Sequence, residues 1–135
     1  MFVHEEKIRV RYAETDQMGY VYYGNYAAYY EVARTEMLRT TGFSYKELED
    51  MGVMMPVLEM NIKYNQPAKY DELLTIKIII KEKPAVRIKF DYEVYNESGD
   101  LLNIGSTQLV FVDMKKNRPC KAPDVFMQKL APYFG

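Results

Sequence analysis

A change in hydrophobic periodicity along the chain sets the strongest limit on its fold. Between Tyr26 and Leu38, apolar and aromatic residues recur every three or four positions, which predicts one stripe of an amphipathic helix. Beyond residue 57 the period falls to two, as expected for strands with one buried face. One long helix followed by several strands predicts an α+β layer architecture.

Capping residues suggest where the helices begin and end. The long helix is expected over residues 25–41, with Asn25 as its N-cap and Gly42 as its stop. A short helix is expected over residues 44–52, because Ser44 begins a sequence with the spacing of a capping box.

The rest of the chain is expected to form an antiparallel sheet and one more helix. The expected strands cover residues 7–12, 58–64, 73–80, 86–94 and 101–113, and the terminal helix covers residues 124–133. Tight connections, such as the turn at residues 96–100, join antiparallel rather than parallel strands. No repeat or linker interrupts the pattern, so a single domain over residues 1–135 is expected.

The rarest residue types limit the chemistry. The chain has one His, one Cys and no Trp. A single His excludes a His-rich metal site, and a single Cys excludes an intrachain disulfide. We interpret His4 and Cys120 as incidental, and expect no metal and no cofactor. Any acid–base chemistry should therefore use carboxylates, backbone groups or tyrosines.

Charge and hydropathy exclude several partners. The formal net charge of −1 gives no general attraction to nucleic acid. No apolar run approaches the roughly 18 residues of a membrane-spanning helix, and the N-terminus does not resemble a signal peptide. A cytoplasmic location is therefore expected. A basic cluster is either a solvated turn or a phosphate contact for a small anionic ligand; it contains Lys115, Lys116, Arg118 and Lys121.

The most unusual segment places Asp16 in a glycine-containing loop directly before the long helix. The start of a helix has unpaired N–H groups that can stabilise negative charge on an oxygen. A carboxylate beside such a helix end could cleave an acyl compound, either by attacking it or by activating water. The alternative is that Asp16 only forms an Asx turn. We interpret the neighbouring Glu14 as structural.

Residues 15–26, with the sequence TDQMGYVYYGNY, resemble the D-x-x-G-x-V-(F/Y)-x-x-x-Y signature of the 4-hydroxybenzoyl-CoA thioesterase-like group of hot dog fold enzymes. Residues 61–64, Pro67 and residues 70–73 match that group more weakly. The resemblance covers nearly the whole chain. It implies a hot dog fold, in which a curved antiparallel sheet wraps around the long central helix.

The same resemblance implies an acyl-CoA thioesterase, which releases a carboxylic acid and free CoA. It implies that Asp16 is the catalytic carboxylate and that the backbone N–H of Tyr23 polarises the carbonyl. Many bacterial relatives have His at the position of Tyr23, which leaves a role for that side chain open. Further candidates for substrate contact are Gly19, Val21, Tyr26, Asn61, Lys63 and Arg118, although Asn61 and Lys63 could instead lie on a solvated sheet face.

Family members form dimers with a continuous sheet, and often tetramers, so the resemblance implies a homodimer or homotetramer with its active sites at the dimer interface. Two alternatives remain open: hydrolysis of a thioester held by an acyl carrier protein, and binding of acyl-CoA without catalysis. A hot dog dehydratase is disfavoured because it would need a His beside a carboxylate. The tyrosines at the start of the helix either pack in the core or form an aromatic acyl pocket.

Overall fold

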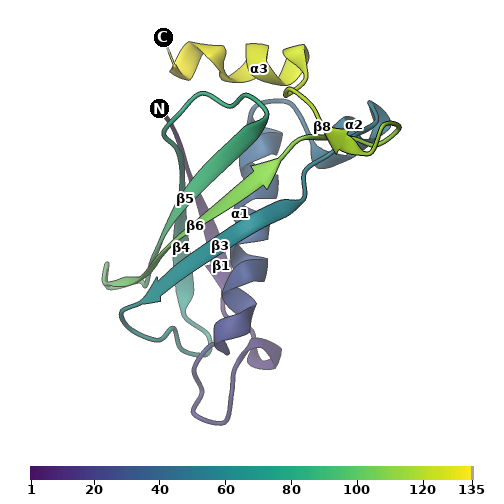
Figure 1. Ribbon diagram of the computed structural model, residues 1–135. Helices are drawn as coiled ribbons and strands as arrows, with labels where there is room; N and C mark the ends of the chain where they lie inside the picture. The colour runs from purple at the N-terminus through teal and green to yellow at the C-terminus, as the bar shows by residue number, and fades with distance from the viewer. Residues whose placement is uncertain (135) are drawn as a thin grey trace.

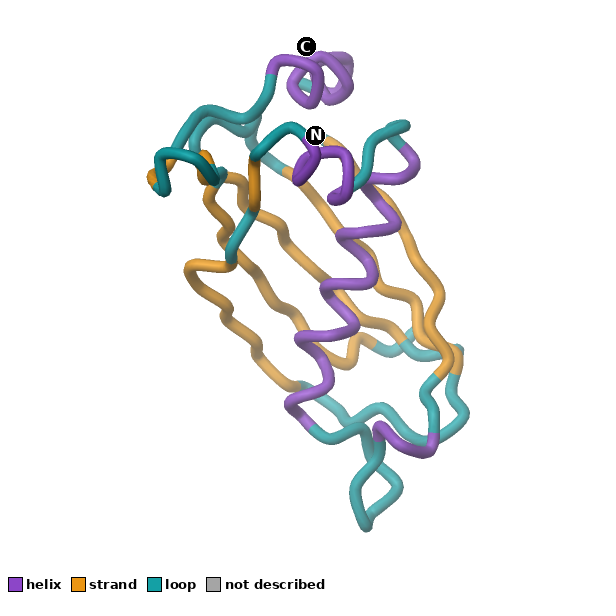
Figure 2. Tube along the Cα trace, turned by 90° about the vertical axis from the view of Figure 1, so that its right-hand side faces the viewer, coloured by secondary structure: helices purple, strands orange, loops and turns teal. Residues whose placement is uncertain are grey.

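The computed structural model describes residues 1–134 and shows a five-stranded antiparallel sheet with one long helix across one face (Figures 1 and 2). The strand order is β1-β4-β5-β6-β3. The bounds are β1 (Phe2–Arg9), α1 (Tyr26–Thr40), β3 (Val57–Tyr64), β4 (Leu73–Ile80), β5 (Arg87–Tyr95) and β6 (Leu101–Val110). The expected α+β architecture is confirmed.

Shorter elements surround this sheet. They are two 3-10 turns (Tyr12–Glu14 and Tyr23–Asn25), α2 (Tyr45–Asp50), β2 (Val53–Met54), β7 (Val112–Asp113), β8 (Arg118–Pro119), α3 (Asp124–Leu130) and a last 3-10 turn (Ala131–Tyr133). Strands β2, β7 and β8 form a second, three-stranded sheet. Figure 1 places β8 and α2 at one end of the molecule and the loop before α1 at the other.

The helix ends were predicted with one error. Asn25 does occupy the N-cap position of α1, but its side chain does not cap the helix, and its amide donates instead to the Glu14 carbonyl oxygen at 2.8 Å. A 3-10 turn directly before α1 starts the helical segment at Tyr23. The other two signals are confirmed: Gly42 follows α1 with φ +81°, and Ser44 Oγ accepts the Glu47 N–H at 3.2 Å.

Two strand predictions need correction. The first strand covers Phe2–Arg9 rather than residues 7–12, and it pairs with β4 along its whole length. The sequence pattern hid this strand because His4 and Glu6 occupy half-buried positions, where they pair with each other at 3.0 Å. The strand expected over residues 101–113 is split, because β7 leaves the large sheet to pair with β2 and β8.

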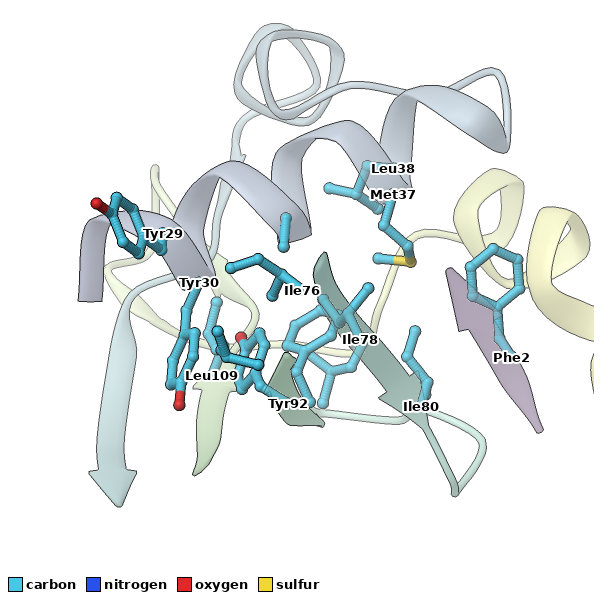
Figure 3. Packing of buried hydrophobic residues seen from close by; sticks show 14 of the residues in the cluster. Phe2, Tyr29, Tyr30, Met37, Leu38, Ile76, Ile78, Ile80, Tyr92 and Leu109 are labelled. Atoms are coloured by element: carbon cyan, nitrogen blue, oxygen red, sulfur yellow. The ribbon is translucent and has the colours of Figure 1, made fainter. Parts of the chain in front are cut away.

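The helix packs on the sheet where Tyr30 stacks on Tyr92 and lies against Gly105. The rings of Tyr30, on α1, and Tyr92, on β5, stack with centroids 4.0 Å apart, and both side chains are buried (Figure 3). A Cβ added to Gly105, on β6, would lie 2.4 Å from the Tyr30 hydroxyl oxygen. The missing side chain at Gly105 therefore sets how closely α1 approaches the sheet.

Three hydroxyl groups beneath α1 are paired within the core. The Tyr30 hydroxyl donates to Asn103 Oδ1 at 2.6 Å, and the hydroxyls of Tyr92 and Thr107 are 2.6 Å apart. The Arg34 guanidinium donates to the Tyr92 hydroxyl at 3.1 Å. Burial raises the pKa of Tyr92 to about 12, so its hydroxyl stays neutral. These bonds satisfy hydroxyls that would be costly to bury alone.

The two edges of the large sheet differ in chemistry. The exposed residues of β1 are mostly charged: Glu5, Lys7 and Arg9. Charged edges resist pairing with other strands. The opposite edge strand, β3, exposes large apolar side chains: Val57, Leu58, Met60 and Tyr64. Glu59 and Lys63 are also exposed on β3, so this edge mixes apolar and charged side chains and is less protected than β1.

Replacement of Gly105 by Ala should destabilise the fold. The new methyl group would overlap the Tyr30 ring, and overpacking of this kind costs about 1–3 kcal/mol. Urea unfolding followed by circular dichroism measures the change. Ser106→Ala, at the adjacent position facing away from α1, is the matched control and should change the free energy of unfolding by less than about 0.5 kcal/mol. Equal stability of the Gly105→Ala variant and the wild type would contradict the close approach.

Candidate active site

The loop that contains Asp16 is a tight turn held against a distant segment. The Gly19 N–H donates to the Asp16 carbonyl oxygen at 3.0 Å, and Gly19 has φ +76°, which favours glycine. Across the loop, the Val21 N–H donates to the Ala68 oxygen at 2.8 Å, and the Tyr70 N–H donates to the Gly19 oxygen at 3.0 Å. The loop is therefore bonded to residues 68–70 on one side.

The Asp16 carboxylate uses one oxygen to hold the turn. Asp16 Oδ1 accepts the N–H groups of Met18, at 2.9 Å, and Tyr20, at 3.2 Å. Among residues 1–134, no group donates to Asp16 Oδ2, and the residue is exposed. The Asx-turn interpretation is thus correct for one oxygen, while the other remains available for chemistry.

The helical segment begins a few residues after this carboxylate. The Asn25 N–H donates to the Tyr22 oxygen at 2.9 Å, which is the first hydrogen bond of the 3-10 turn. The Tyr23 N–H, one position into that turn, finds no acceptor within the described part of the chain. The first N–H groups of a helix are unpaired because no preceding turn supplies a carbonyl oxygen to accept from them. They therefore carry partial positive charge. The candidate carbonyl polariser is therefore present as a free donor.

Glu14 braces the entrance of the helix. Its Oε1 accepts the Arg11 N–H at 2.9 Å and the Tyr29 hydroxyl at 3.0 Å, while Oε2 accepts the Arg11 guanidinium at 3.0 Å. Burial acts to raise the pKa of Glu14, but the hydrogen bonds from Arg11 and Tyr29 outweigh it and hold the pKa below its ordinary value. The Glu14 backbone oxygen accepts the Tyr22 N–H at 2.9 Å. These contacts fit the structural interpretation of Glu14.

A hollow of about 290 Å³ opens on one side of Asp16. Four predicted site residues line it: Asp16, Val21, Tyr23 and Tyr26. Tyr20, Tyr64 and residues 65–67 complete the lining. The rings of Tyr26 and Tyr64 lie 5.7 Å apart and form an aromatic wall at the end of β3.

Asp16 also borders a second hollow, of about 650 Å³. Its lining residues are Tyr12, Thr15, Asp16, Gln17, Gly19 and Tyr70. Asp16 lines both hollows, and Gly19, the remaining predicted residue of the loop, lines this one.

Three predicted site residues lie elsewhere in the single chain. Asn61 lines a polar hollow on the outer face of the sheet, opposite α1, and Lys63 shares its orientation two positions further along β3. Arg118, in β8, lies at the end of the molecule opposite the Asp16 loop (Figure 1). The structure does not bring these three residues to Asp16.

Tyr20 and Tyr64 line the first hollow but were not among the predicted site residues. Tyr64 was expected in a strand and in the weaker family match over residues 61–64, but nothing in a linear pattern shows that the end of β3 meets the loop before α1. The exposure of Tyr64 at a strand end is the one property that sets it apart from a core tyrosine.

The tyrosines around the helix entrance have divided roles. Tyr26, Tyr29 and Tyr30 are buried, which fits the packing interpretation. Tyr22 and Tyr23 are exposed, with ring centroids 4.7 Å apart. Tyr23 and Tyr26 also line the hollow beside Asp16, so packing and pocket formation share this group.

Comparison with known proteins gives a consistent result. The model of a family described as the thioesterase-like superfamily matches residues 10–130. The chain belongs to this superfamily.

Individual relatives agree with this assignment. A putative acyl-CoA thioesterase of Bacillus subtilis, YneP, is 36% identical over 126 residues, which cover 93% of this chain and 91% of that protein. The acyl-CoA thioester hydrolase YbgC of Escherichia coli is 37% identical over 116 residues, covering 86% and 87%. Among solved structures, a DHNA-CoA thioesterase from Staphylococcus aureus superposes with a TM-score of 0.92 at 32% identity, covering 98% of this chain and 91% of that one.

These findings confirm the resemblance to the 4-hydroxybenzoyl-CoA thioesterase-like group, the hot dog fold and the expected enzyme class, thioester hydrolase. Within residues 1–134, no helix is both long and apolar enough to cross a membrane. Over the same residues, no cluster of three or more His, Cys, Asp or Glu side chains is arranged to hold a metal ion.

Proposed function

We propose that the chain is an acyl-CoA thioesterase in which Asp16 is the catalytic carboxylate. The observation that carries the proposal is the state of this side chain: Oδ1 is fixed by two N–H groups, while Oδ2 is free beside an aromatic hollow. The names of the related proteins YneP and YbgC support acyl-CoA as the substrate class.

Two routes use this geometry. In the first, Asp16 accepts a proton from water as the water attacks the thioester carbonyl, and the C–S bond then breaks. In the second, Asp16 Oδ2 attacks the carbonyl, displaces the CoA thiolate and forms an anhydride that water hydrolyses. Both routes convert thioester and water into a carboxylic acid and free CoA. Neither needs a metal or redox cofactor.

The Tyr23 N–H stabilises the oxygen that becomes negative in either route. Hydrogen-bond donors held in place before the reaction stabilise such an oxyanion without reorganising. Val21 and Tyr26 shape the hollow for the acyl group, and Gly19 permits the turn that presents Asp16. The proposed function therefore depends on the residues around Asp16 as well as on its carboxylate.

A second copy of the chain completes the site. The β3 edge exposes apolar side chains and ends at Tyr64, which lines the hollow beside Asp16. When β3 pairs with β3 of a second copy across a two-fold axis, the two strands run antiparallel. The start of one β3 then lies beside the end of the other. The partner's β3 would then cover Tyr64 and close the hollow. Arg118 could reach bound CoA only from another subunit.

The charges on β3 select one pairing register. With the two-fold axis at Asn61, Glu59 lies opposite the partner's Lys63, and Met60 lies opposite the partner's Ile62. A one-residue change of the pairing register would turn the faces over, and a two-residue change would separate Glu59 from the partner's Lys63. Asn61 and Lys63 therefore belong to the interface between copies rather than to the acyl pocket.

Replacement of Asp16 by Asn should abolish turnover without unfolding the loop. The amide oxygen can still accept the Met18 and Tyr20 N–H groups, but the side chain can no longer attack or accept a proton. We expect kcat to fall by about 10²–10⁴ on the best substrate of an acyl-CoA panel, measured by release of free thiol.

Asp124→Asn removes the same charge at the exposed start of α3 and should leave kcat unchanged. An Asp16→Asn variant as fast as the wild type would contradict the assigned role. Comparison of matched CoA and carrier-protein esters identifies the preferred carrier, and tight binding of CoA esters without turnover by the wild type would favour a binding protein.

Replacement of Tyr23 by Pro tests the backbone donor. Proline lacks an N–H but suits the first position of a helical segment, and the preceding Tyr22 already has the extended φ −60° and ψ 130° that proline requires. We expect kcat to fall by about 10²–10³. Tyr23→Ala removes the side chain and keeps the N–H, so it is the control; equal rates for the two variants would exclude the donor role.

Reversal of one charge on β3 should weaken self-association. Glu59→Lys places like charges opposite each other twice in the dimer, and we expect the dimer Kd to rise by roughly threefold to thirtyfold. Lys63→Glu should have the same effect, and the double variant should restore the wild-type Kd, measured by sedimentation equilibrium. Failure of the double variant to restore association would reject this register.

A further inference from the structure

Glu14, two residues before Asp16, joins the loop to the start of the helical segment. Its backbone oxygen accepts the Tyr22 N–H at 2.9 Å and the Asn25 side-chain amide at 2.8 Å. These two donors lie on either side of Tyr23 along the chain. The backbone of Tyr23, whose N–H is the candidate carbonyl polariser, is therefore held relative to Glu14 at both ends of its 3-10 turn.

The Glu14 carboxylate makes a second connection, to α1 itself. Its Oε1 accepts the hydroxyl of Tyr29, in the first turn of α1, at 3.0 Å. The Tyr29 ring is buried, and its hydroxyl points away from Tyr30, which faces the sheet (Figure 3). The same carboxylate oxygen accepts the Arg11 N–H at 2.9 Å. With only 14% of its side chain exposed, Glu14 thus bonds the loop to the helix through an enclosed charged group, and hydrogen bonds to charged groups are the stronger kind.

The short stretch between Glu14 and Asp16 is fixed as well. The Thr15 N–H donates to the Tyr12 oxygen at 3.1 Å. The Asp16 N–H donates to the Tyr20 oxygen at 2.8 Å. Because this stretch is held, the bonds of Glu14 set the place of the helix start relative to Asp16. Misplacement of a reacting group by about 1 Å can cost about 10²-fold in rate.

Glu14 itself is poorly placed to react with a substrate. It lines neither of the two hollows that border Asp16. Each of its three oxygens already accepts at least one hydrogen bond from the surrounding chain. Any effect of Glu14 on catalysis therefore has to act through the groups that it holds.

We propose that Glu14 is a positioning residue, which holds the Tyr23 N–H at a fixed place relative to the Asp16 carboxylate. Tyr29 and Asn25 act with it. This inference rests on the proposed thioesterase function. A donor that is in place before the reaction stabilises the oxyanion without reorganising, so loss of the connection lowers kcat. KM stays close to the wild-type value, because the residues that line the hollows are unchanged.

Replacement of Glu14 by Ala tests the role of the carboxylate and leaves the backbone oxygen in place. We expect kcat on the best acyl-CoA ester to fall by about tenfold to a hundredfold, with KM changed by less than about threefold. Glu14→Gln keeps an oxygen that can accept the Tyr29 hydroxyl and the Arg11 N–H, so it should retain at least about a third of the wild-type kcat. A loss confined to KM would overturn the proposal.

A double-mutant cycle tests whether Glu14 acts through the Tyr23 donor. In the Tyr23→Pro background the donor is already missing, so the addition of Glu14→Ala should lower kcat by less than about threefold more. If the two losses multiply instead, Glu14 does not act through this donor and the proposal is wrong.

Two further variants separate positioning from stability. Tyr29→Phe removes one hydroxyl and keeps the buried ring, so it tests the proposal even if Glu14→Ala does not fold; its kcat should fall by about threefold to tenfold. Tyr92→Phe is the matched control, because it removes a buried hydroxyl that bonds to Thr107, away from the loop, and it should change kcat by less than about twofold. Circular dichroism at the assay temperature establishes that each variant is folded.

The remaining outcomes are distinct. An unchanged kcat in Tyr29→Phe, or an equal loss in Tyr29→Phe and Tyr92→Phe, would overturn the proposal. So would a Glu14→Ala variant as fast as the wild type while Asp16→Asn is inactive. Failure of the proposed function looks different, because Asp16→Asn would then retain turnover.

Discussion

The contact between α1 and the sheet determines where everything else in the molecule can lie. Gly105 has no side chain, so the Tyr30 ring fits against β6 and stacks on Tyr92. The Tyr30 hydroxyl then reaches Asn103, which fixes the rotation of the helix as well as its distance from the sheet. Because the helix is rigid, this one contact also positions its N-terminal end and the adjoining 3-10 turn, where Tyr23 presents an unpaired N–H.

The candidate site is assembled from segments that are far apart in the sequence. The Asp16 loop is bonded to residues 68–70, and the start of the helix is bonded to Glu14 through the Tyr22 N–H. Tyr64, at the end of β3, supplies the aromatic wall. Each part is secured by backbone hydrogen bonds rather than by side-chain packing alone. Support of this kind holds a hydrogen-bond donor and a carboxylate at fixed positions relative to each other.

Much of the architecture was accessible from the sequence, because α1 and the central strands follow regular periods. The first strand was predicted several residues too late in the sequence. His4 and Glu6 pair in half-buried positions where periodicity expects apolar residues. Asn25 stands at the expected N-cap position, but its side chain does not cap the helix because its amide bonds to the Glu14 backbone on the loop. Asp16 was found through a loop signature, whereas the place of Tyr64 in the hollow depends on tertiary neighbours that no linear pattern encodes. The distance of Asn61 and Arg118 from Asp16 is likewise set by the tertiary structure and could not be seen in the linear sequence.

The contrast between the two sheet edges has a consequence for the behaviour of the chain in solution. A newly made chain presents the apolar β3 edge, with its unpaired backbone groups, before any other copy covers it. Such an edge is a better template for misassembly than β1, whose exposed side chains are mostly charged. Recovery of soluble protein at high expression should therefore be limited by how fast β3 is covered, and heating should produce aggregates that grow from this edge.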